Sequence, residues 1–166
     1  GIKERTSFTV KQPHGVVGLI VPANTPIANI AWKVFPALIC GNTVILKASE
    51  DAPNTANLFA KICKDAGLDK GVLNVIHGDS FAGSQLVKDQ RVKLISFTGS
   101  TETGIKIAAQ SSQNMKRISL ELGGKNPFIV CDDADLNEAV HWAVLSAFSN
   151  AGQRCASGSR IIVMEN

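Results

Sequence analysis

The sequence predicts an α/β fold: a doubly wound parallel sheet that runs into the start of a second α/β domain. Short apolar runs alternate along the chain with segments of helical periodicity, which is the order that a parallel sheet with covering helices requires. The predicted strands are apolar throughout, as expected for strands that are buried on both faces. The length of 166 residues suffices for one domain and part of another.

The first elements follow from apolar runs and their breaks. Residues 15–21 (GVVGLIV) form a strand-sized apolar run that ends at Pro22. Apolar residues then recur at helical spacing over residues 27–38, until Gly41 ends the predicted helix. Residues 43–46 are β-branched and apolar, and therefore predict the second strand.

The same alternation continues as far as residues 119–122 and 128–131, two predicted strands that follow one another without a helix between them. Helices are predicted near residues 53–66, 82–88, 99–108 and 135–147, and strands near residues 72–76, 92–97, 119–122 and 128–131. Asp135, with Glu138 three residues later, predicts a capping box at the last helix. The strand–helix rhythm changes at Gly123-Gly124, which predicts a first domain at residues 1–122 and a truncated second domain at 123–166.

Composition excludes several classes of protein. The chain is 45% hydrophobic and 19% charged, which is ordinary for a soluble globular protein. Its net charge of +3 is too small and too evenly spread for a nucleic-acid partner. No run reaches membrane-spanning length and no signal peptide is visible, so we expect no membrane partner and a cytoplasmic setting. The chain is expected to be an excerpt of a longer protein.

The four cysteines form no C-x-x-C pair and match no zinc spacing. Cys40, Cys63 and Cys131 lie in apolar stretches and are expected to be small buried side chains. Cys155 differs, because small residues and Arg154 surround it, a setting that suits an accessible thiolate. A lone cysteine in such a loop is nevertheless more often inert than catalytic.

Polar groups follow four of the predicted strands. Since a parallel sheet binds ligands at the carboxyl ends of its strands, these positions are candidate site residues. They are Pro22-Ala23-Asn24, Lys47-Ala48-Ser49-Glu50, Thr98-Gly99-Ser100 and Glu121-Leu122-Gly123-Gly124. The segment around Cys155 supplies a fifth polar element after a helix.

Each of these positions has a structural and a functional interpretation. Lys47 and Glu50 are either a solvated ion pair or a site for the ribose of a nucleotide. Glu121 is either a buried, paired structural carboxylate or a general base whose pKa is raised by burial. Ser100 begins a helix that offers free N–H groups to an anion. The P-loop-like spacing from Gly78 lacks its lysine, which favours a simple turn before a helix.

Four stretches taken together resemble the aldehyde dehydrogenase superfamily over nearly the whole chain. They are VPANTPIANIAWKVFPALICGNTVILKASE, SFTGSTETG, LELGGKNP and GQRCASGSR. The resemblance implies a Rossmann-like nucleotide-binding domain followed by the start of a catalytic domain. It also implies an enzyme that oxidises an aldehyde to a carboxylic acid through a cysteine thioester, with no metal.

The resemblance assigns roles to particular residues. Cys155 would be the nucleophile, Glu121 the general base and Asn24 the oxyanion donor. Lys47 and Glu50 would hold the adenosine ribose. The other cofactor-binding residues that it implies are Val21, Pro22, Gly83, Phe97, Gly99, Ser100, Thr103, Leu122 and Gly123, with Lys125 beside them.

The cofactor and the assembly follow from the same resemblance. NAD is expected rather than NADP, because the Glu50 carboxylate would accept the ribose hydroxyls and repel a 2′-phosphate. Residues 1–12 would form a strand used in subunit pairing, in a full-length homodimer or homotetramer. Ala23 stands where family members often have an aromatic residue, which leaves the class of aldehyde open.

Two other functions compete with this one. A CoA-acylating relative would transfer the thioester to a thiol, but members of that branch tend to lack the glutamate that is present here as Glu121. A non-catalytic protein of the same fold would be favoured by loss of Cys155 or Asn24, and both residues are present.

Overall fold

The computed structural model of the chain describes residues 5–165. Strands and helices alternate as the sequence predicts, with boundaries shifted by a few residues. The elements are β1 (Val16–Ile20), α1 (Pro26–Ile39), β2 (Thr43–Lys47), α2 (Pro53–Asp65), β3 (Leu73–Ile76), α3 (Ser80–Lys88), β4 (Val92–Gly99), α4 (Thr101–Ser112), β5 (Arg117–Leu122), β6 (Asn126–Val130), α5 (Leu136–Phe148), the 3-10 turn η1 (Ser149–Gly152) and β7 (Gly158–Val163).

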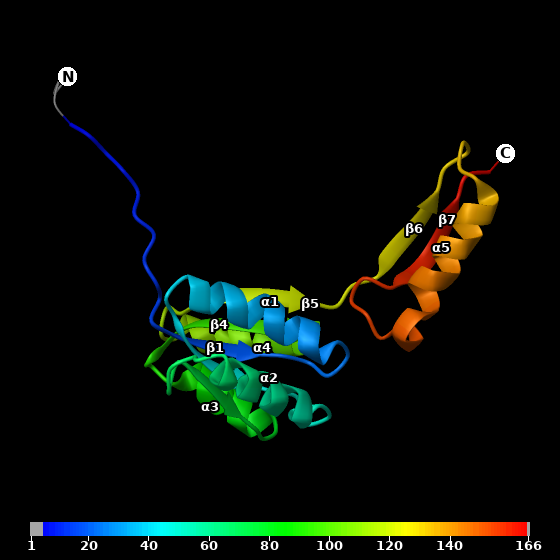
Figure 1. Cartoon of the computed structure of the whole chain (residues 1–166). Helices are drawn as coiled ribbons and strands as arrows, with labels where there is room; N and C mark the ends of the chain where they lie inside the picture. Colours follow the sequence, from blue (N-terminus) through cyan, green and yellow to red (C-terminus); the bar gives the residue numbers. More distant parts are fainter. Residues whose placement is uncertain (1–4, 166) are drawn as a thin grey trace.

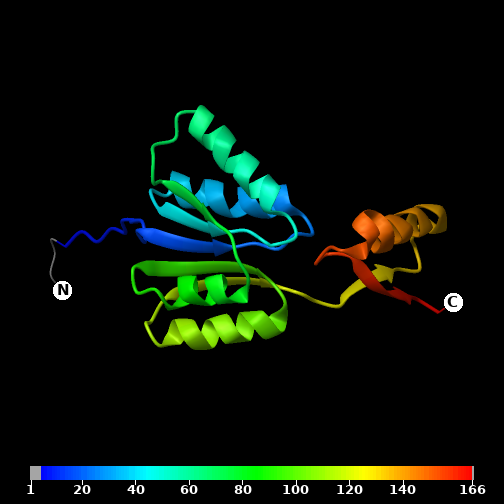
Figure 2. The ribbon, with the colours of Figure 1, turned by 90° about the horizontal axis from the view of Figure 1, so that it is seen from below.

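The first five strands form one parallel sheet in the order β3-β2-β1-β4-β5. Helices α1 and α2 lie on one face of this sheet, and α3 and α4 lie on the other (Figure 2). The predicted doubly wound sheet is therefore confirmed. Because all five strands run the same way, their carboxyl ends share one edge of the sheet.

Apolar side chains fill both faces of the sheet. Val34 and Ala56 are fully buried on the side of α1 and α2, and Ile95 and Val87 are buried on the side of α3 and α4. A Cβ atom on Gly18 would lie only 2.8 Å from the Ile95 side chain, so glycine allows α3 to pack closely on the sheet. This packing holds the strand ends in fixed positions.

Side-chain caps begin three of the helices. Asp79, Ser100 and Asp135 each accept hydrogen bonds from backbone N–H groups in the first turn of α3, α4 and α5. The Asp135 half of the predicted capping box is present, but among the described residues no hydrogen bond from the Asp135 N–H to the Glu138 side chain completes it. Glu138 accepts a hydrogen bond from Trp142 Nε1 at 3.2 Å, so it completes a side-chain pair along the helix.

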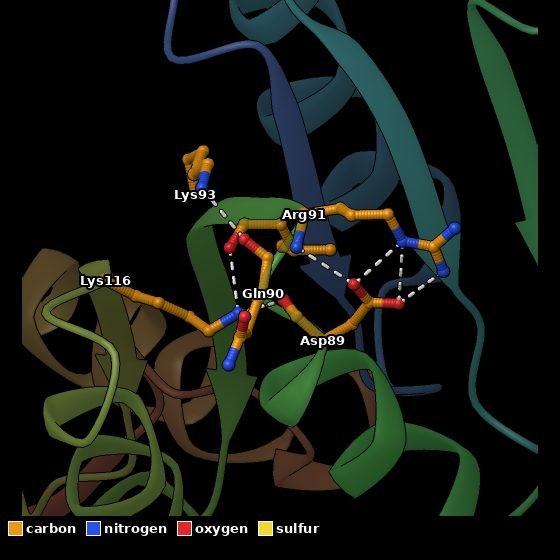
Figure 3. A network of polar contacts seen from close by, with 6 residues as sticks. Asp89, Gln90, Arg91, Lys93 and Lys116 are labelled. Carbon is orange, nitrogen blue, oxygen red and sulfur yellow. Dashed lines mark hydrogen bonds and ion pairs between the residues drawn. The ribbon is translucent and has the colours of Figure 1, made fainter.

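A polar network joins α3 to the amino ends of β4 and β5 (Figure 3). The Asp89 carboxylate accepts hydrogen bonds from the Arg91 guanidinium, the shortest at 2.6 Å. Lys116 donates to the carbonyl oxygens of Asp89 and Val92, the latter at 2.8 Å. The network fixes the turn that precedes β4, at the edge of the sheet opposite the strand ends that carry the candidate site.

Strands β6 and β7 form a separate two-stranded parallel sheet against which α5 packs. Figure 1 shows this unit at one end of the larger sheet, joined to it by the segment between β5 and β6. No residue of α5 is buried, and its large apolar side chains are exposed. The change of sheet falls at residues 123–125, and the division into two domains stays a prediction.

The predicted burial of the cysteines is wrong for two of them. Cys40 and Cys131 are exposed and Cys63 is half-buried. Cys40 caps the end of α1, where the helix leaves the core, and Cys131 follows β6 in the thinly covered second unit. Apolar neighbours in sequence do not bury a side chain unless the fold also covers it.

The amino-terminal segment forms no strand within the chain over residues 5–14. Residues 1–4 of the predicted pairing strand lie outside the described residues, and its role in subunit pairing stays a prediction. The helices of residues 5–165 include none long and apolar enough to cross a membrane.

Candidate active site

A cavity of about 610 Å³ opens at the carboxyl edge of the five-stranded sheet. Its walls come from the segment after β1, from the ends of β4 and β5, and from the loop after α5. Seven of the predicted site residues line it: Pro22, Asn24, Gly99, Glu121, Leu122, Gly123 and Cys155. The structure thus brings together the three predicted catalytic residues, which come from three distant parts of the chain.

The Asn24 side chain is half-buried between β1 and α1. Its Nδ2 donates to the carbonyl oxygen of Gln153 at 2.8 Å, which leaves a second N–H for another acceptor. Its Oδ1 accepts from Asn29 Nδ2 at 3.5 Å. These two contacts orient the amide with its nitrogen toward the loop that carries Cys155.

Cys155 is exposed, in the turn that follows η1. Asn126 Nδ2 donates to the carbonyl oxygens of Cys155 and Ser157, the latter at 3.2 Å. These contacts hold the backbone of the turn and leave the thiol free. Among residues 5–165, the backbone N–H of Cys155 has no hydrogen-bond acceptor, so it is available to an oxyanion.

Glu121 is exposed, so the burial that both interpretations of this residue assumed is wrong, and its role as general base stays a prediction. It lies on β5, an edge strand, and pairs in register with Thr98 of β4. Helix α4 packs against the opposite face of β5, and on the face that carries Glu121 a second cavity of about 990 Å³ opens beside α1. Glu121 lines both cavities, so water can reach its carboxylate.

Lys33 is a candidate functional residue that the sequence analysis missed. It is half-buried on α1, and its Nζ donates to Ser96 Oγ at 2.7 Å. Burial lowers the pKa of its ammonium group, and the negative charge of Glu121 raises it. The sequence carries a signal for it, because Lys33 is the only charged residue in the helix PIANIAWKVFPALI.

Lys47 and Glu50 form an ion pair, but only its Glu50 end is solvated. The Lys47 side chain is only 8% exposed, whereas that of Glu50 is 59% exposed, and their charged atoms Nζ and Oε2 lie 4.0 Å apart. Lys47 ends β2, which β1 and β3 flank, so its stem is covered. Val21 N–H donates to the Lys47 carbonyl oxygen at 3.2 Å and ties the ends of β1 and β2 together.

The amino terminus of α4 suits a phosphate. Ser100 Oγ accepts from Thr103 N at 3.2 Å and donates to Thr103 Oγ1 at 2.9 Å. Within the described residues, the N–H groups of Thr101 and Glu102 have no acceptor, and they point out of the helix start. A Cβ on Gly99 would clash with the Phe97 ring at 2.4 Å, so glycine permits the close packing of this strand end.

Several predicted cofactor-binding residues lie along the same edge of the sheet but outside the cavity at Cys155. They are Val21, Lys47, Glu50, Gly83, Phe97, Ser100 and Thr103. A Cβ on Gly83 would meet nothing within 4 Å, so the space beside α3 is open. Because these residues extend from β2 to α4, their arrangement suits a long ligand. The free N–H groups at the start of α4 and the charged residues at the end of β2 fit a dinucleotide. Residues 5–165 contain no group of three metal-ligating side chains.

The fold and these site residues together define one class of protein. Comparison with known sequences identifies that class. The pattern of the Aldehyde dehydrogenase family matches residues 2–166, and the chain belongs to that family. Betaine aldehyde dehydrogenase 1 of Oryza sativa subsp. japonica is 49% identical over 160 residues, which cover 96% of this chain and 32% of that protein.

Solved structures show the same similarity. The crystal structure of an E. coli NADP-dependent enzyme superposes with a TM-score of 0.90 at 45% identity, covering 92% of this chain and 32% of that one. PnpE of Pseudomonas sp. WBC-3, in complex with nicotinamide adenine dinucleotide, has a TM-score of 0.90 at 44% identity, covering 93% and 32%. The chain therefore spans about a third of the length of the relatives that it matches.

Proposed function

We propose that the complete protein oxidises an aldehyde to a carboxylic acid with NAD, through a covalent intermediate on Cys155. One observation carries this proposal: Cys155, Glu121 and Asn24 line one cavity at the carboxyl edge of the sheet. A nucleophile, a general base and an oxyanion donor are the groups that this reaction requires.

The reaction follows from the positions of these groups. The Cys155 thiolate adds to the carbonyl carbon of the aldehyde, and the carbonyl oxygen becomes an oxyanion. The free N–H of Asn24 and the backbone N–H of Cys155 stabilise that charge. Bound NAD supplies the acceptor for the hydride that leaves the same carbon. The acyl group then remains on Cys155 as a thioester.

Glu121 completes the reaction. Its carboxylate removes a proton from a water molecule that attacks the thioester carbon, and the thiolate of Cys155 leaves as the carboxylic acid forms. The exposure of Glu121 at the junction of two cavities supports this role, because water reaches it. The presence of a glutamate at position 121 favours hydrolysis over transfer of the acyl group to CoA, because CoA-acylating relatives tend to lack it.

The preference for NAD rests on Glu50. Its exposed carboxylate follows β2 at the cofactor edge of the sheet, where it can accept ribose hydroxyls and would repel a 2′-phosphate. Relatives of both kinds exist, one crystallised with NAD and one described as NADP-dependent. The family resemblance also implies a homodimer or homotetramer, and the cytoplasmic location stays a prediction.

The test is Cys155→Ala in the complete protein, with Cys131→Ala as the matched control, since both thiols are exposed. We expect the first variant to lose NAD-dependent aldehyde oxidation while still binding NAD, and the control to keep both. NADH absorbance measures turnover, and quenching of protein fluorescence measures binding. Normal turnover by the Cys155→Ala variant would refute the proposed mechanism.

A further inference from the structure

Two hydrogen bonds tie the five-stranded sheet to the unit that carries Cys155. Asn150 Nδ2 donates to the main-chain oxygen of Asn24 at 3.0 Å. In return, Asn24 Nδ2 donates to the main-chain oxygen of Gln153 at 2.8 Å. Within residues 5–165, no other hydrogen bond joins these two units, so Asn24, Asn150 and Gln153 form a clasp across the cavity.

The backbone at one side of the clasp is in an unusual conformation. Asn150 and Ala151 both have φ of 55°, and Gly152 follows with φ of 73°. Three successive left-handed residues are rare, and alanine has no preference for this region. Asparagine tolerates it better than most residues, and a hydrogen bond to another segment can hold it there.

The Asn150 side chain makes the contacts that stabilise this turn. Besides Asn24, its Nδ2 approaches the Gln153 carbonyl oxygen at 3.4 Å, and Gln153 N donates to the Asn150 carbonyl oxygen at 3.0 Å. Cys155 lies two residues beyond Gln153. The distance between the Asn24 amide and the cysteine therefore depends on the conformation of residues 150–153.

We propose that Asn150 is a positioning residue, which sets the Asn24 amide against the Cys155 loop by joining the two across the cavity. This role rests on the proposed function, since it acts through the oxyanion donor and the nucleophile. An amide donor that is displaced from the oxyanion loses most of its effect on the transition state, while binding of the substrate changes little.

Two variants of the complete protein separate the side chain from the backbone. Asn150→Gly keeps the left-handed conformation and removes the amide. Asn150→Asp keeps the shape and replaces both N–H donors by a carboxylate that faces two carbonyl oxygens. Met115→Gly is the matched control, because Met115 is also left-handed with φ of 51° and does not line the cavity.

We expect both Asn150 variants to slow the NADH burst of the first turnover, with kcat lower by about 10-fold to 100-fold. KM and the dissociation constant for NAD should stay within about twofold of the parent values, because the lost interaction acts in the transition state. The Met115→Gly control should keep the burst rate. Thermal unfolding midpoints, measured in parallel, show whether each variant is folded.

A burst rate and kcat within about twofold of the parent in Asn150→Gly would overturn the proposal. So would an equal loss in Met115→Gly, or a loss confined to KM, which would make Asn150 a ground-state contact of the substrate. Failure of the proposed function has a different signature. In that case the parent protein shows no burst that depends on Cys155, whatever residue stands at position 150.

Discussion

Glu121 and Lys33 lie on different elements and line the same cavity of about 990 Å³. Burial lowers the pKa of the Lys33 ammonium group, while the charge of Glu121 opposes that change. Ser96 accepts a hydrogen bond from Lys33 Nζ and keeps the ammonium group close to the sheet. The structure thus places a cationic side chain and the proposed general base at one cavity.

Replacing Glu121 by Gln in the complete protein should uncouple the two halves of the reaction. Thioester formation should remain, and its hydrolysis should slow by about 100-fold or more, because the attacking water loses its base. Rapid mixing with NAD and an aldehyde should show a burst of NADH followed by slow turnover. If the burst disappears as well, Glu121 also deprotonates Cys155.

Replacing Glu50 by Thr should change the choice of cofactor. The hydroxyl no longer repels a 2′-phosphate, so catalytic efficiency with NADP should rise relative to NAD by about tenfold, which corresponds to about 1.4 kcal/mol. Lys47, 4.0 Å from Glu50, already softens the repulsion and limits the effect. Steady-state kinetics with both cofactors measure the ratio. Equal efficiency with both in the parent protein would contradict the role of Glu50.

At the scale of elements, the turn between α3 and β4 depends on one carboxylate (Figure 3). The hydrogen bonds from the Arg91 side chain and backbone hold the pKa of Asp89 well below its ordinary value of 3.8. A carboxyl group whose folded-state pKa is lowered stabilises the protein above its unfolded-state pKa. That contribution is lost as the pH falls through the folded-state pKa.

Asp89→Asn should therefore lower the thermal midpoint at about pH 6, and this difference should shrink as the pH falls below about 4. Asparagine keeps an oxygen for the Arg91 N–H but loses the charge. The effect should be small, because Arg91 is 85% exposed and solvent screens the pair. The control is Asp132→Asn, since Asp132 forms no ion pair with the described residues. A difference that grows at low pH would contradict this account.

At the scale of the whole molecule, the unit of β6, α5 and β7 exposes much apolar surface. Val140, Trp142, Val144 and Phe148 of α5 are each more than half exposed, as are Ile161 and Val163 of β7. Surface of this kind normally contacts protein. The chain spans about a third of the length of its relatives. We therefore expect other parts of the complete protein to cover this apolar surface.

The isolated 166-residue chain should consequently be inactive as an aldehyde dehydrogenase and prone to aggregation. It has the three catalytic groups, but its second unit is held to the sheet by only two hydrogen bonds of the described residues. Light scattering and NADH absorbance on the purified chain measure the two outcomes. Measurable aldehyde oxidation by this chain would show that the residues lining the cavity in these 166 residues suffice for the reaction.

The sequence alone determined the order of strands and helices, the parallel sheet and the set of candidate residues. Apolar periodicity, glycine breaks and caps such as Asp135 are local signals, and short-range contacts suffice to produce them. The family followed from four stretches whose joint presence is specific. The roles of Cys155, Glu121 and Asn24 came from that resemblance and stay predictions.

Only the tertiary structure decided burial and contact. Glu121 is exposed because β5 is an edge strand, and Lys47 is buried because its neighbours β1 and β3 flank β2. The pairing of Lys33 with Ser96 and of Asn24 with Asn150 joins residues 63 and 126 positions apart. Such contacts depend on how elements pack in three dimensions, and the pattern of one segment carries no information about the segment that will lie against it.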